Sequence, residues 1–111
     1  MSAWENYQRG LWHVYLYRQK DIAAALQFFE YATAADPRFA PAVAGQAYAL
    51  YVQAIWGFVA DVSANLQKAR QLAQRAVALD AREAFAHLVL GRVLNTTGEV
   101  APRRGVGGGT L

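Results

Sequence analysis

The sequence predicts an all-α fold, a right-handed superhelical stack of antiparallel helical hairpins with about five helices. Residues 25–37 and 69–81 match each other, because alanine, an apolar residue, a second alanine and a final aspartate recur at the same offsets. A repeat this short cannot bury its apolar face alone and stacks on a neighbour of the same shape. No long run alternates apolar and polar residues with the period of two that is typical of strands.

The first repeat predicts two helices. Residues 3–18 carry Tyr7, Leu11 and Tyr15 at helical spacing. A turn is expected over residues 19–21, with Asp21 as the N-cap of a second helix that runs to residue 35. Pro37 ends that helix, because the residue before a proline is driven out of the helical region.

The second repeat predicts a helix over residues 40–55, with Pro41 in its first turn, where no N–H is needed. After a longer connection, Asp61 or Ser63 caps a fourth helix that ends at residue 79. A fifth helix is expected from about residue 83 to 97, before Gly98. The residues that the two repeats share are expected at helix contacts; they are Ala25, Phe29, Ala32, Ala69, Ala73 and Ala76.

These segments form one expected domain over residues 3–100, with repeats at about 3–37 and 38–81 and a partial repeat at 82–100. Residues 101–111 are rich in glycine and poor in large apolar side chains. Ordering glycine is costly, and little apolar area is available in return. We therefore expect this tail to be disordered.

The composition argues against several classes of protein. The 111 residues carry a formal net charge of +3, and Arg103 and Arg104 of the tail supply much of it, so no nucleic-acid surface is expected. The chain has no cysteine, which excludes disulfides and thiolate sites and fits a cytoplasmic location. Residues 39–60 lack charge, but their alanine, glycine and glutamine content favours a helix packed on both sides over a membrane span.

The sequence shows no arrangement that is typical of an enzyme. Neither His13 nor His87 has an acid or a second histidine three or four residues after it, and neither serine has a partner base nearby. We therefore expect no catalytic residue, no metal site and no cofactor.

The pattern Ala25, Phe29, Ala32 and Pro37, preceded by a glycine in the first helix, resembles the tetratricopeptide repeat. The runs 7–13, 36–45 and 84–91 are similar to the repeat region of bacterial class III adenylate cyclases and related transcriptional regulators. This resemblance covers residues 3–100. The chain departs from the pattern in longer first and second repeats, in Ala81 where proline is usual, and in a third repeat that lacks its second helix.

The resemblance implies a non-enzymatic module that binds a protein segment or a partner domain in a concave groove. First helices form the inner wall in such repeats. Phenol, guanidinium and amide groups there can hold a peptide through hydrogen bonds and stacking. The groove positions that the resemblance implies are Tyr48, Tyr51, Leu88, Arg92 and Asn95. The chain contains no cyclase domain, so the resemblance does not imply cyclase activity.

The incomplete third repeat leaves an alternative open. Without a following helix, an apolar strip at Val89, Val93 and Val100 is expected to be exposed. Two copies could bury this strip against each other, which would make the chain a structural homo-oligomerisation unit.

Overall fold

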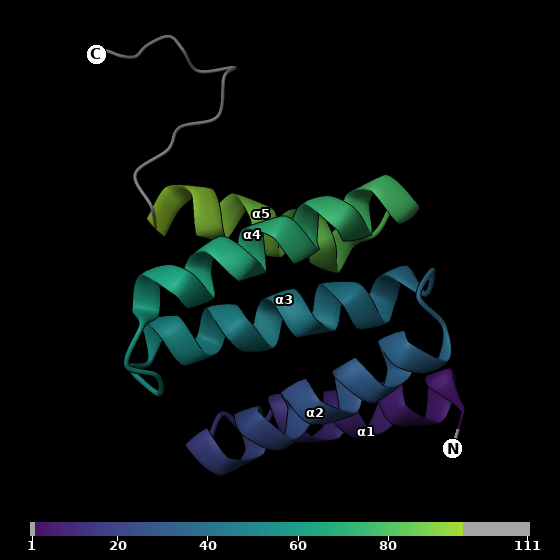
Figure 1. Cartoon of the computed structure of the whole chain (residues 1–111), viewed down its shortest axis with the longest axis horizontal. Helices are drawn as coiled ribbons and strands as arrows, with labels where there is room; N and C mark the ends of the chain where they lie inside the picture. The colour runs from purple at the N-terminus through teal and green to yellow at the C-terminus, as the bar shows by residue number, and fades with distance from the viewer. Residues whose placement is uncertain (1, 97–111) are drawn as a thin grey trace, which may run out of the picture.

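The computed structural model describes residues 2–96, and this part of the chain is all-helical, with no strand (Figure 1). The helix count agrees with the prediction. The helices are α1 (Ala3–Val14), α2 (Gln19–Ala35), α3 (Ala40–Ile55), α4 (Val62–Leu79) and α5 (Ala84–Thr96). The glycine-rich tail at 101–111 and Val100 lie outside the described residues.

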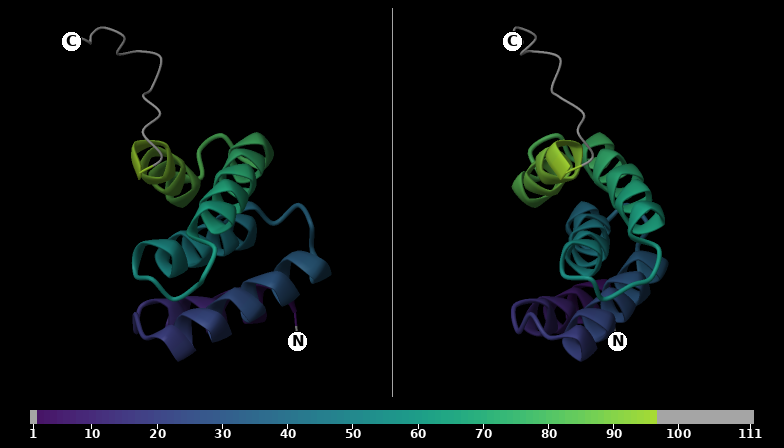
Figure 2. Two further views of the ribbon diagram at one scale, coloured as in Figure 1. Left: turned by 60° about the vertical axis from the view of Figure 1, so that its left-hand side comes forward. Right: turned by 90° about the vertical axis from the view of Figure 1, so that its left-hand side faces the viewer.

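Helix α3 lies at the centre of the molecule and packs against each of the other four helices (Figure 1). The α1–α2 pair lies on one side of it, and the α4–α5 pair on the other. Seen end-on, α1, α3 and α5 follow one side of the molecule, while α2 and α4 follow the other (Figure 2). Helices α1 and α5 do not pack against each other, but each packs against α3.

The two matching segments end their helices with the same hydrogen bonds. Asp36 and Asp80 end α2 and α4, and their N–H groups donate at 2.9 Å to the carbonyls of Ala32 and Ala76. Each carboxylate then accepts the N–H two residues later, at 3.1 Å in the first repeat and 3.0 Å in the second. The same residue type therefore builds the same turn twice.

The expected helix contacts are confirmed. All six residues that the repeats share are fully buried, namely Ala25, Phe29, Ala32, Ala69, Ala73 and Ala76. Phe29 is the largest fully buried side chain, and its ring lies against both Gly10 of α1 and Gly45 of α3. Small residues let the helix backbones approach closely, and the one large ring fills the remaining space.

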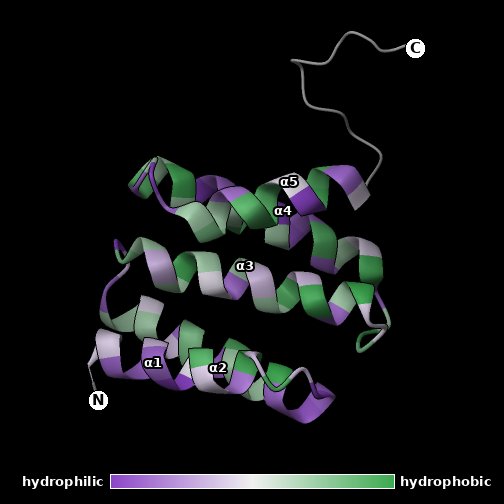
Figure 3. Ribbon diagram, turned by 180° about the vertical axis from the view of Figure 1, so that it is seen from behind, coloured by the Kyte–Doolittle hydropathy of each residue, from purple (hydrophilic) through white to green (hydrophobic). Residues whose placement is uncertain are grey.

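Helix α3 carries no charged residue and is buried on nearly every side. Its residues range from apolar to polar along the helix (Figure 3). The burial explains the uncharged run in the sequence, because the helix faces both hairpins rather than one. Within residues 2–96, no helix combines the length and the apolar character that crossing a membrane requires.

The predicted first turn is wrong. Helix α1 ends at Val14 instead of residue 18, and Tyr17 follows with a φ of 54°, a left-handed conformation that a helix cannot contain. Helix α2 then starts at Gln19, so its N-cap is Arg18 and not Asp21. Asp21 lies in the first turn of α2 and uses its carboxylate in a tertiary contact instead.

Candidate protein-binding groove

An open groove of about 550 Å³ separates α1 from the start of α5. Its α1 wall consists of residues spaced by four, which lie on one face of a helix. Its other wall consists of the last residue of the α4–α5 connection and the first turns of α5. The lining residues are Tyr7, Leu11, Tyr15, Glu83, Ala84, Phe85 and Leu88.

Tyr48 of α3 packs against the α5 wall of this groove and against the turn that follows α1. Its ring lies 4.8 Å from the ring of Phe85 and meets the ring of Tyr17 edge-on at 6.5 Å. The hydroxyl groups of Tyr48 and Tyr17 are hydrogen-bonded to each other. Burial raises the pKa of the Tyr48 phenol, and the hydrogen bond with Tyr17 raises it further. Tyr48 is therefore neutral at physiological pH and holds Phe85 in place.

The α1 wall is firmly supported from beneath. The ring of Tyr7 lies 6.0 Å from that of the buried Phe29 and meets Phe39 edge-on at 5.4 Å. Burial raises the pKa of Tyr7, and the negative charge of Glu83 adds to this effect. Glu83 and Tyr7 line opposite walls of the groove.

Glu83 is fixed at the start of α5, because its Oε2 atom accepts the N–H of Phe85 at 3.1 Å. Among the described residues that line the groove, Glu83 alone carries a charge. The groove therefore combines aromatic and aliphatic surface with a single carboxylate.

Of the five groove residues that the resemblance implies, the structure places one in the lining of the groove and four outside it. Leu88 lines the groove and is 45% exposed. Tyr48 and Tyr51 are half-buried and pack against two core clusters instead of lining the groove. Tyr48 also contacts Phe85 of the groove wall. Arg92 and Asn95 are exposed further along α5, and neither lines the groove.

Sequence reasoning missed most of the groove, including Tyr7, Leu11, Tyr15, Glu83 and Phe85. The spacing of the three α1 residues was visible, but it indicates only that they share a helix face. Whether that face is covered depends on how far α3 holds α5 from α1, and no local pattern reports this.

The expected exposed strip on α5 is wrong for the two residues that the structure describes. Val89 and Val93 are both fully buried, in a cluster with Ala47 and Leu50 of α3 and with Ala69 and Ala73 of α4. The small alanines let α5 settle against α3 and α4 together, so no following helix is needed to cover these valines.

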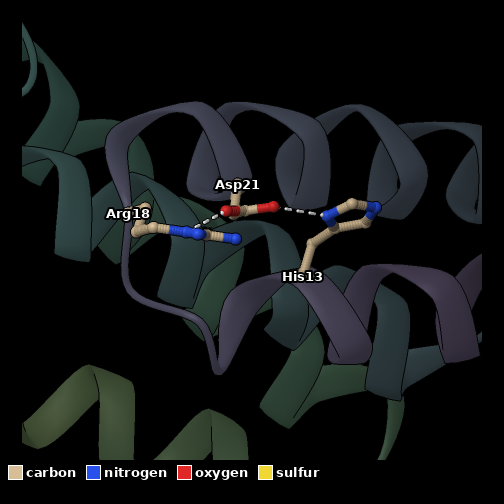
Figure 4. Close-up of polar contacts among 3 residues, drawn as sticks. All are labelled: His13, Arg18 and Asp21. Carbon is tan, nitrogen blue, oxygen red and sulfur yellow. Dashed lines mark hydrogen bonds and ion pairs between the residues drawn. The ribbon is translucent and has the colours of Figure 1, made fainter.

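The two histidines make structural contacts. His13 Nδ1 lies 2.9 Å from Asp21 Oδ1, and Arg18 Nε donates at 2.7 Å to Asp21 Oδ2 (Figure 4). His87 Nε2 lies 2.7 Å from the carbonyl oxygen of Ala81. Across residues 2–96, no three His, Cys, Asp or Glu side chains are grouped to hold a metal ion.

Compared with known proteins, the chain matches no protein-family model, no curated protein and no solved structure.

Proposed function

We propose that this chain is a non-enzymatic protein-interaction module, a tetratricopeptide-like stack of helical hairpins that binds a protein segment in the groove between α1 and α5. The observation that carries the proposal is the groove itself, which presents aromatic and aliphatic side chains to solvent between two helices that do not touch. An open apolar groove with a rigid floor suits an extended or helical peptide.

The exposed side chains of the groove are suited to anchoring a peptide. Tyr15 is 60% exposed and Leu88 is 45% exposed, and they lie on opposite walls. Tyrosine provides a large contact area with few rotatable bonds, so ordering it on binding costs little. The walls can therefore hold an apolar ligand side chain between them.

The charge of the groove favours a segment with a basic residue beside its apolar anchor. Among the lining residues that the structure describes, Glu83 alone is charged, and it shares the groove with the rings of Tyr7 and Phe85. A lysine or arginine placed there gains an ion pair and contact with aromatic faces. An acidic segment would instead be repelled.

Selection from a displayed random-peptide library tests this function. We expect the wild-type chain to enrich peptides that combine an apolar residue with a basic one. Leu88→Asp and Tyr15→Ala should weaken binding of the selected peptides at least tenfold in fluorescence anisotropy, because both remove exposed anchor surface.

Tyr31→Ala provides a matched control, since Tyr31 is 51% exposed but lies on α2. It should leave peptide affinity unchanged. A library that yields no enriched sequence, or a selected peptide that binds all three variants as well as the wild type, would contradict the proposal. The lack of cysteine further favours a cytoplasmic location.

A further inference from the structure

The face of α1 that adjoins the groove exposes two tryptophans. Trp4 is 58% exposed and Trp12 is 65% exposed. They border a hollow of about 520 Å³, which Glu5, Gln8, Arg9 and His13 also line. A single exposed tryptophan needs no partner, but two on one helix face are typical of an interaction surface.

Both indoles are held by other rings although they are exposed. The ring of Trp4 lies 5.8 Å from Tyr7 and 6.4 Å from Phe39. Trp12 meets His13 edge-on at 4.9 Å.

His13 is itself fixed, because it stacks on Phe28 at 5.5 Å and bonds to Asp21. Side chains that are already ordered lose little entropy when a partner covers them, so this face is prepared for docking.

The face is self-complementary. Trp4 and Trp12 lie at equal distances along the helix on either side of Gln8. If two α1 helices pair antiparallel about a two-fold axis at Gln8, Trp4 of each copy lies opposite Trp12 of the other.

The charges of the face agree with the same arrangement. Glu5 and Arg9 lie on the same flank of the face. A two-fold axis brings this flank of one copy next to the same flank of the other copy. Because the helices run antiparallel, Glu5 of each copy then approaches Arg9 of the other. Glu5 already accepts the N–H of Ser2 at 2.8 Å through Oε1, and a carboxylate has further acceptor sites for a guanidinium.

We propose that this face binds a second copy of the chain and forms an antiparallel α1–α1 dimer. The four indoles of such a pair cover on the order of 600 Å², about half of what a small specific interface buries. The flanking charged and polar side chains supply the remainder. Trp4 also contacts Tyr7 of the groove wall, so the dimer face adjoins the groove. Cross-linking and sedimentation measure the dimer without a peptide, so this test does not depend on the function proposed for the groove.

A cysteine cross-link provides a sharp test, because the natural chain has no cysteine. In Gln8→Cys the two thiols meet at the two-fold axis, so mild oxidation should yield a disulfide-linked dimer rapidly. Gln71→Cys is the matched control, since Gln71 is exposed on α4, and it should cross-link at least tenfold more slowly. Equal rates for the two variants would overturn the proposal.

Sedimentation equilibrium gives an independent measurement. The wild-type chain should be dimeric, and Trp12→Ala should raise the dissociation constant at least tenfold. Trp56→Ala is the control, because Trp56 is 55% exposed but follows α3, and it should leave the constant unchanged. Circular dichroism confirms that each variant is folded. A wild-type chain that stays monomeric up to about 1 mM refutes the dimer, as does an equal loss of dimer in the two tryptophan variants.

Discussion

At the scale of single residues, the closest packing surrounds the ring of Phe29. A Cβ atom added at Gly10 would lie 2.5 Å from that ring, and one at Gly45 would lie 2.8 Å from it. Gly91 of α5 differs, because an added Cβ would meet nothing within 4 Å. The first two glycines are therefore required by the ring of Phe29, whereas Gly91 has no such neighbour.

This contrast predicts opposite effects of the same substitution. Gly45→Ala should lower the free energy of unfolding by about 1–3 kcal/mol, because the methyl group overpacks against a ring that cannot move away. Gly91→Ala should raise it by about 0.5–1 kcal/mol, because alanine favours a helix. Urea denaturation of the two variants measures both changes. A change of the same sign in both would show that the ring does not decide the effect.

Asp21 predicts a dependence of stability on pH. The hydrogen bond with His13 lowers the pKa of this carboxyl, and the bond from Arg18 lowers it further. The folded state then binds the proton less tightly than the unfolded chain, so this stabilisation is present at neutral pH and is lost as the pH falls below about 4. Asp21→Asn should therefore be less stable at pH 7 and should lose less stability on acidification. Denaturant titrations between about pH 2 and 7 test this, and identical pH profiles would contradict it.

At the scale of elements, the sequence predicted helices better than their ends. The sequence left Asp61 and Ser63 as the two candidates for the N-cap of α4. Asp61 is the N-cap, because its carboxylate accepts the N–H of Ala64 at 2.9 Å. The end of α1 was missed because residues 15–18 contain no glycine or proline to mark a turn. The break between α1 and α2 is marked only in the structure, by the left-handed backbone of Tyr17 and by the contact of Asp21 with His13.

The N-cap hydrogen bond of Asp61 allows a prediction of how much stability is lost when this side chain is removed. Asp61→Ala should lower the free energy of unfolding by about 1 kcal/mol, because the N–H of Ala64 loses its acceptor. Ser63→Ala is the control in the same turn, since Ser63 is exposed and caps nothing, and it should change stability little. Thermal denaturation by circular dichroism compares the two. Equal losses would show that the cap is not what stabilises this helix end.

At the scale of the whole molecule, the all-helical class and the contacts of the repeat residues could be predicted, because both follow from local periodicity. The position of the groove could not be predicted from the sequence. Its position depends on α3 holding α1 and α5 apart, and on Tyr48 reaching from α3 to Phe85. Which face of α5 is buried depends on how α3, α4 and α5 pack together. Val89 and Val93 were therefore expected at the surface, but they are buried.

Val93→Glu tests this docking of α5. The charge would be buried among Leu50, Ala69 and Ala73, so we expect a loss of about 3–5 kcal/mol in the free energy of unfolding. Asn95→Glu on the exposed side of α5 should cost little. Guanidinium denaturation measures both variants. If Val93→Glu left the free energy of unfolding unchanged, α5 would not be docked as described.

The order in which the helices pack has a consequence for how the chain folds. The four most extensive helix pairings join helices that are adjacent in sequence, and only the α3–α5 and α1–α3 contacts pass over an intervening helix. Few residues separate most of the partners, so little chain entropy is lost before each contact forms, and low contact order of this kind gives folding in milliseconds or less. During synthesis, the α1–α2 hairpin is complete before α3 emerges. Each later helix can therefore pack against helices that have already been synthesised, which shortens the time that this alanine-rich interior is exposed to aggregation.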